Sequence, residues 1–215
     1  MTKLVKLPFK KILALSAHTD DMEFGAGGTI HRLLQQGSEV YSAVFSSCEE
    51  SVPEGFAKDV LVGEMYESAA QLGIVAENIS LFPFPVRRFP HYRQEILEDL
   101  VRLQRKLQPD MILVPCSQDV HQDHQVIHNE AVRAFRYQSI FGYELPWNNI
   151  SFSTDALIEL SEENIDAKAA AIARYKSQGF RHYAQRDFFY GHARLRGVQK
   201  KAPLAEAFEV IRLSL

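Results

Sequence analysis

The stretch ILALSAHTDDMEFGAGGT, residues 12–29, sets the expectations for the fold. Its first six residues, 12–17, form a continuous apolar run that is typical of a buried strand in a parallel sheet. Polar residues follow at once, from His18 to Asp21, and a glycine-rich turn leads into a helical pattern over residues 28–36. This order of strand, polar turn and helix predicts the first unit of an α/β domain.

The rest of the chain repeats this alternation of short apolar runs and longer helical patterns. The runs predict further strands at residues 39–46, 79–82, 111–114 and 155–160, and the patterns predict helices at 56–72, 92–107, 126–135 and 167–175. Strands that alternate with helices favour a parallel sheet covered by helices. Because the 215 residues contain no linker or repeat, we expect one domain over residues 1–215.

Composition and charge narrow the functional classes. The formal net charge of -3 gives no overall attraction for nucleic acid or for an anionic membrane. The cysteines, Cys48 and Cys116, form neither a disulfide framework nor a CxxC metal site, which fits a reducing compartment. The apolar run at 12–17 is too short for a signal peptide or a membrane span. We therefore expect a cytoplasmic protein without stable membrane insertion.

A second polar cluster follows the predicted strand at 111–114 and contains His121, Asp123 and His124. In open α/β sheets, ligands bind beyond the carboxyl ends of the strands, and zinc accepts imidazole and carboxylate ligands. Taken singly, His18 is compatible with a buried core histidine, and the neighbouring aspartates with helix caps. The two clusters together favour a metal site, because a cation relieves the repulsion between adjacent carboxylates.

The glycine-rich stretch Gly25–Gly28 raises the alternative of a dinucleotide-binding loop. It lacks the GxGxxG spacing, and it follows acidic residues that would repel a pyrophosphate. A nucleotide-binding regulator is therefore the least favoured class.

The two polar clusters resemble the motifs of a known family. AHTDDMEFGAGGT, residues 17–29, resembles the AHPDDxExxxGGT motif of the LmbE-like, or PIG-L, zinc deacetylases, and SQDVHQDH, residues 117–124, resembles their second motif, which ends in HxDH. The resemblance implies a Rossmann-like three-layer sandwich with a mostly parallel central sheet. It also implies an enzyme that removes the N-acetyl group from an N-acetyl amino sugar or glycoconjugate.

The resemblance assigns a role to each motif residue. The implied ligands of a Zn²⁺ ion are His18, Asp21 and His124. Another divalent metal such as Fe²⁺ also suits this set. Asp20 would act as the general base for the metal-bound water, His121 would polarise the amide carbonyl, and Asp123 would orient His121.

The substrate side of the site is less well defined. Many family members carry an arginine before the helix that ends in Leu-Gly, but this chain has none there, and Arg87 and Arg88 are the candidates to replace it. Tyr143 is a candidate to contact a sugar, with core packing as the alternative. Alternative functions are a metal-dependent amidase for another acylated amine, such as a thiol conjugate, and an inactive sugar- or metal-binding homologue. The family also implies a homo-oligomer.

Overall fold

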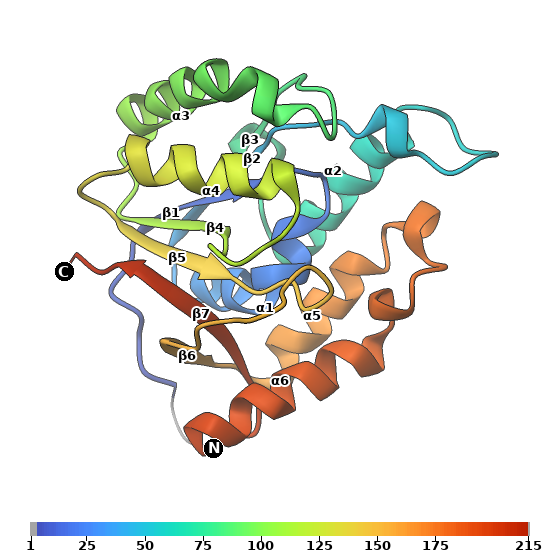
Figure 1. Ribbon diagram of the computed structural model, residues 1–215. Helices are drawn as coiled ribbons and strands as arrows, with labels where there is room; N and C mark the ends of the chain where they lie inside the picture. The colour runs from blue at the N-terminus through green and yellow to red at the C-terminus, as the bar shows by residue number, and fades with distance from the viewer. Residues whose placement is uncertain (1–3, 215) are drawn as a thin grey trace.

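The computed structural model describes residues 4–214 and shows helices packed on both faces of one sheet (Figure 1). The strands are β1 (Lys11–Ser16), β2 (Glu39–Val44), β3 (Ile79–Leu81), β4 (Met111–Pro115), β5 (Ser139–Tyr143), β6 (Ala156–Glu159) and β7 (Ala205–Arg212). The α-helices are α1 (Asp21–Gln35), α2 (Val60–Leu72), α3 (Arg93–Leu107), α4 (Gln122–Ala134), α5 (Glu162–Ile172) and α6 (Arg186–Lys200).

The sheet has the strand order β3-β2-β1-β4-β5-β7-β6. Strands β1 to β5 are parallel to one another, and β7 runs antiparallel to both β5 and β6. The chain builds outward from β1 to β3 and then returns to place β4 on the other side of β1, so the strand order reverses between β1 and β4. A reversal of this kind opens a crevice at the carboxyl ends of the two strands.

Side-chain alternation along the strands explains the two helical layers. One apolar cluster joins Ile12 and Ala14 of β1 to residues of α1, α2, α5 and α6. A second cluster joins Leu13 and Leu15 of the same strand to α3 and α4. Because successive side chains of a strand point to opposite faces, both faces of β1 are buried and the strand needs a continuous apolar sequence. The prediction of a Rossmann-like three-layer sandwich with a mostly parallel sheet is confirmed.

The starts of α1 and α5 differ most from the predicted ones, and α2 and α4 also begin at other residues than predicted. Helix α1 begins at Asp21 rather than at residue 28, so the glycine-rich stretch lies inside the helix and is not a turn. Its glycines let neighbouring groups approach closely: a Cβ on Gly25 would lie 2.2 Å from Cδ2 of Tyr143. Helix α5 begins at Glu162 rather than at residue 167, because Ser161 and Asn164 form a reciprocal capping box. Strands β5 and β7 and helix α6 were not predicted.

Candidate active site

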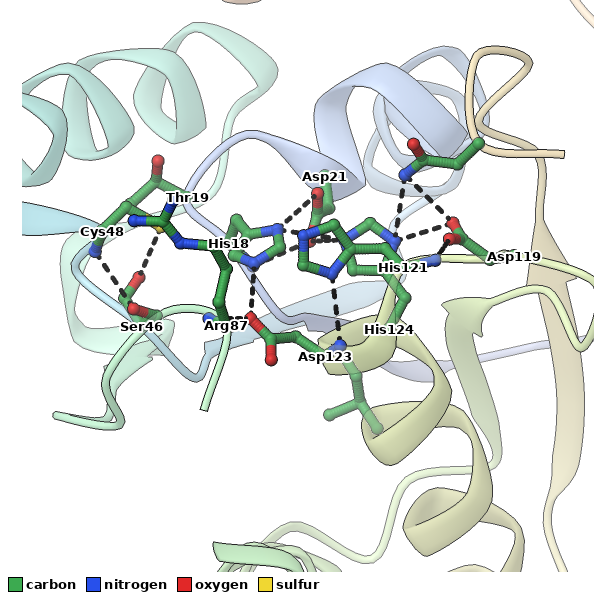
Figure 2. A network of polar contacts seen from close by, with 12 residues as sticks. His18, Thr19, Asp21, Ser46, Cys48, Arg87, Asp119, His121, Asp123 and His124 are labelled. Atoms are coloured by element: carbon green, nitrogen blue, oxygen red, sulfur yellow. Dashed lines mark hydrogen bonds and ion pairs between the residues drawn. The ribbon is translucent and has the colours of Figure 1, made fainter. Parts of the chain in front are cut away.

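The two polar clusters meet in one cavity at the reversal point of the sheet. Strands β1 and β4 are adjacent and parallel, so the residues that follow them lie side by side. The cavity has a volume of about 210 Å³, and both the segment from His18 to Asp21 and the pair His121 and His124 line it. Figure 2 shows the side chains of His18, Asp21, His121 and His124 directed toward one another from the end of β1, the start of α1 and the start of α4.

Three donor groups converge at distances that suit a metal ion. Nδ1 of His18 lies 3.0 Å from Nε2 of His124. The carboxylate of Asp21 lies 3.3 Å from Nε2 of His124 and 3.6 Å from Nδ1 of His18. A tetrahedral zinc site with ligand bonds of about 2.0–2.1 Å has ligand-to-ligand edges of about 3.3 Å. The two nitrogens and the Asp21 carboxylate, measured to Oδ1 from His18 and to Oδ2 from His124, therefore stand about as far apart as the ligands of one tetrahedral ion.

Two buried aspartates fix the tautomers of the histidines. Nδ1 of His124 lies 2.7 Å from Oδ2 of Asp119, and Nε2 of His18 lies 3.1 Å from Oδ2 of Asp123. An ionised carboxylate can only accept a hydrogen bond, so each of these ring nitrogens carries the proton. In the neutral form of each ring, the opposite nitrogen, which faces Asp21, then carries a lone pair. This carboxylate–histidine arrangement is the usual support of metal-binding imidazoles.

His121 provides a second arrangement of nitrogen donors. The side-chain nitrogens of His18, His121 and His124 lie within 4.8 Å of one another and could also hold a metal ion. Nδ1 of His121 accepts a hydrogen bond from the backbone N–H of Asp123, 3.2 Å away, at the start of α4. The neutral ring therefore carries its proton on Nε2. Burial, together with the nearby His18 and His124, lowers the pKa of His121 to about 4, which keeps this ring neutral at pH 7.

Asp123 has a different partner from the one expected. Its carboxylate accepts hydrogen bonds from Nε2 of His18, from the backbone N–H of Arg87 at 2.5 Å and from the backbone N–H of Phe89 at 3.2 Å. Only its backbone N–H contacts His121. The Asp123 side chain thus orients His18 and the loop that carries Arg87, and within residues 4–214 its hydrogen bond to His121 comes from the backbone.

Asp20 occupies the N-cap position of α1, but its side chain makes no capping hydrogen bond. It lines the cavity beside the three donor groups, so the alternative that this aspartate serves as a helix cap does not account for it. Burial and the charge of Asp21 raise its pKa, although His18 and Arg181 oppose the shift. A carboxylate with a raised pKa that faces a cavity is a suitable proton acceptor.

The three residues predicted to contact substrate lie in different places. Arg87 lines the cavity, and its backbone has a φ of 66°, in the left-handed region that a non-glycine residue rarely adopts. Arg88 is exposed and does not line the cavity. Tyr143 is wholly buried in the core, and its hydroxyl donates to the carbonyl of Leu15 at 2.9 Å. Tyr143 thus follows the alternative of core packing, because the glycines of α1 admit its ring to the core.

Several residues in or beside the cavity are given no role by the motifs. Asp119 lies inside the quoted second motif, and its carboxylate contacts His124. Arg181 and Tyr183 come from the connection between α5 and α6, far along the chain from either motif. Neither residue stands in a recognisable pattern, so only the folded chain brings them to the metal donors.

Comparisons with known proteins define the class of the chain. The family model "PIG-L: GlcNAc-PI de-N-acetylase" matches residues 13–135, which is more than half of the chain and includes both polar clusters. The protein belongs to the PIG-L family, and the resemblance identified from the motifs is confirmed. Members of this family are deacetylases, so the chain belongs to a class of hydrolytic enzymes.

Particular relatives agree with this assignment. The chain is 29% identical over 175 residues to the uncharacterized deacetylase YaiS of Escherichia coli K12, covering 78% of this chain and 91% of YaiS. Its fold is similar to that of N,N'-diacetylchitobiose deacetylase from Pyrococcus horikoshii, with a TM-score of 0.80 and 22% identity over 95% of this chain and 84% of the other. GalB, a 4-carboxy-2-hydroxymuconate hydratase from Pseudomonas putida KT2440, also shares the fold, with a TM-score of 0.77 and 20% identity, covering 96% of this chain and 98% of GalB. The fold by itself therefore does not determine the reaction.

Within residues 4–214, none of the helices combines the length and the apolar character that a membrane crossing requires.

Proposed function

We propose that this protein is a zinc-dependent N-deacetylase that hydrolyses the acetamide of an N-acetyl amino sugar. Membership of the PIG-L family supports the deacetylase class, and the names of the family and of the Pyrococcus relative support an N-acetylglucosamine-type substrate. The observation that carries the proposal is the spacing of 3.0–3.6 Å among the donor atoms of His18, Asp21 and His124. One domain over residues 1–215 and a homo-oligomer remain predictions.

The donor set determines which chemistry the site can support. Two neutral imidazoles and one carboxylate suit Zn²⁺, and they leave a fourth position open, as in catalytic rather than structural sites. When bound, such an ion lowers the pKa of a coordinated water and polarises a carbonyl oxygen. Fe²⁺ also suits the donors, so metal analysis must identify the native ion.

The remaining cavity residues handle protons and charge. Asp20 accepts the proton of the attacking water and returns it to the leaving amine, since its carboxylate lines the cavity and has no capping role. His121 donates its Nε2–H to the carbonyl oxygen as negative charge develops there. The backbone N–H of Asp123 fixes the required tautomer by occupying Nδ1 of His121. At neutral pH, the role of Asp20 needs an ionised carboxylate, and the role of His121 needs a neutral imidazole.

A metal analysis combined with a deacetylation assay tests the proposal. The purified protein should contain about one equivalent of zinc per chain and should release acetate from N-acetylglucosamine or diacetylchitobiose. Asp20→Ala should keep its metal and lose at least about 100-fold in turnover, because general-base catalysis contributes about 10²–10⁴-fold. Asp59→Ala is the matched control, since Asp59 occupies the N-cap position of α2, is exposed and also makes no capping bond. Full activity of Asp20→Ala with intact metal would show that Asp20 is not the base.

Two further variants distinguish the possible ligand sets. His124→Ala should abolish metal binding, since His124 belongs to both sets. His121→Ala should retain the metal but lose about 10²–10³-fold in rate if His121 stabilises the oxyanion. Loss of the metal from His121→Ala would favour the three-histidine set.

A substrate panel decides between the proposed function and its alternatives. An amidase for another acylated amine, such as a thiol conjugate, would turn over that conjugate and leave N-acetylglucosamine intact. An inactive homologue would bind metal and release acetate from none of the compounds.

A further inference from the structure

Part of the cavity wall comes from the chain beyond residue 135, where the match to the family model ends. Trp147, Gln178, Arg181 and Tyr183 line the same cavity as the metal donors. The donors and Asp20 all lie within the matched residues 13–135, whereas these four residues all lie outside them. Substrate contacts that differ between family members are therefore expected from this wall.

Aromatic packing holds this wall in place. The rings of Trp147 and Tyr183 are stacked, with centroids 3.9 Å apart and planes at 13°. Phe24 of α1 meets the edge of Trp147 with a centroid distance of 5.1 Å. The guanidinium of Arg181 lies 5.5 Å from the centroid of the Tyr183 ring. Arg181 is thus supported by side chains that are themselves packed.

Hydrogen bonds fix the orientation of Arg181 and leave part of its donor capacity unused. Nε donates to Oε1 of Gln178 at 2.7 Å, and one terminal nitrogen donates to the hydroxyl of Tyr183. A guanidinium has five N–H donors, so three have no partner within residues 4–214. Arg181 and Asp20 line the same cavity, so the free donors belong to a side chain that borders the site.

Arg181 also lacks an ion-pair partner in the described part of the chain. No carboxylate there lies within 4.0 Å of its guanidinium. Arg196 shows the contrast, because both carboxylate oxygens of Glu144 accept from its guanidinium. A cation that is held rigidly, lacks a carboxylate and lines a cavity is suited to bind an anionic oxygen group of a ligand, since the planar guanidinium matches carboxylate and phosphate oxygens.

We propose that Arg181 binds an anionic oxygen group, a phosphate or a carboxylate, carried by the acetamido sugar that this enzyme deacetylates. The inference rests on the proposed function and identifies the class of substrate within it. Arg87 adds a second guanidinium to the cavity lining, which increases the local positive charge. Arg181 is the specificity residue because it is anchored by Gln178 and Tyr183, whereas no hydrogen bond or ion pair holds the side chain of Arg87 among residues 4–214.

Paired neutral and anionic substrates test the inference. The neutral compound is methyl N-acetylglucosaminide, and the anionic ones are N-acetylglucosamine 1-phosphate, N-acetylglucosamine 6-phosphate and N-acetylmuramic acid. The wild type should favour at least one anionic compound by about 10- to 100-fold in kcat/KM, as expected for a charge-assisted bidentate contact. Arg181→Met should remove most of that preference, measured as the ratio of kcat/KM for the anionic and neutral compounds, and Arg181→Lys should keep part of it.

Controls separate recognition from structural damage. Arg194→Met, at an exposed position of α6 outside the cavity lining, should retain the wild-type preference. Tyr183→Phe removes one hydrogen-bond partner of Arg181 and keeps the stacked ring, so it should reduce the preference partially if Arg181→Met does not fold. Equal kcat/KM for neutral and anionic compounds, or a preference that survives Arg181→Met, would overturn the inference.

Binding measurements keep this test independent of the proposed reaction. Calorimetric titration of N-acetylglucosamine 1-phosphate, its 6-phosphate and N-acetylmuramic acid should show tighter binding of at least one by the wild type than by Arg181→Met, whether or not acetate is released. If no acetamide is hydrolysed but this difference is found, the proposed deacetylation fails and the anionic site stands. If the neutral sugar is deacetylated and Arg181→Met binds every anionic sugar as well as the wild type, the deacetylase stands and the anionic site fails.

Discussion

Replacing Gly25 by alanine adds one methyl group to α1, at a place where the structure has no room for it. The added Cβ would lie 2.2 Å from Cδ2 and 2.6 Å from Cγ of Tyr143, well inside the optimal carbon–carbon separation of about 3.5–4.0 Å. The Tyr143 ring is wholly buried, and its hydroxyl is bonded to the carbonyl of Leu15. Neither the ring nor the helix can move without disturbing the core beside the site.

The expected loss of stability follows from these contacts. Overpacking a core typically costs about 1–3 kcal/mol, and disrupting the buried hydrogen bond of Tyr143 adds about 1–3 kcal/mol. The better helix propensity of alanine offsets about 0.5–1 kcal/mol. We therefore expect Gly25→Ala to lower the free energy of unfolding by about 2–4 kcal/mol, the central part of the range that these contributions span.

Gly63→Ala is the matched control, because it makes the same change inside another helix. A Cβ on Gly63 of α2 meets no atom within 4 Å, so we expect a gain of about 0.5–1 kcal/mol from helix propensity alone. Equilibrium unfolding in urea, followed by circular dichroism, measures both variants. If Gly25→Ala were as stable as Gly63→Ala, the packing of Tyr143 on α1 would be refuted.

Three other predictions concern the metal and the pH dependence of stability. Asp119→Ala should weaken zinc affinity about 10- to 100-fold in a chelator competition, because His124 loses its buried carboxylate partner. Unchanged affinity would show that Asp119 does not support His124 as a metal ligand. Removing the metal with a chelator should lower Tm, added zinc should restore it, and His124→Ala should show neither effect, since an ion that binds only the folded state stabilises it. Burial opposes ionisation of Glu144, but hydrogen bonds and charges from His192 and Arg196 outweigh it and lower its pKa below 4.5. Stability from this carboxylate is therefore present above pH 4.5 and lost as pH falls through the folded-state pKa. The difference in unfolding free energy between wild type and Glu144→Gln should shrink below pH 4.5. A difference that did not depend on pH would argue against the pairing.

Local sequence patterns predicted the ends of an element well where its apolar residues form one regular buried face. Helix α3 was predicted nearly to its ends, since Ile96, Leu97, Leu100 and Leu103 form one buried face. Helix α6 was missed because only Phe189, Ala193 and Gly197 are buried along it. Gly197 lies against the backbone of Ala202 and Pro203, a contact that no periodicity reveals.

The start of α1 shows tertiary packing overriding local preference. Three glycines within four residues disfavour a helix, so the sequence indicated a turn there. In the folded chain these glycines admit Tyr143, Lys168 and Glu206, and the buried carboxylate of Glu206 accepts from the backbone N–H groups of Gly28 and Thr29. Those partners lie far from α1 in sequence, so their contribution cannot be read from a local window.

The sequence alone shows polar residues after two predicted buried strands. The family motifs identify the candidate metal donors among these residues. Parallel strands end at the same edge of a sheet, so these residues were expected to meet. Which groups support these residues depends on the tertiary structure: the carboxylate of Asp123 contacts His18, Tyr143 lies in the core, and Arg181 lines the cavity. The physical reason is that periodicity records which residues of an element are buried, whereas contacts between distant segments depend on strand order and on the space that neighbouring side chains leave.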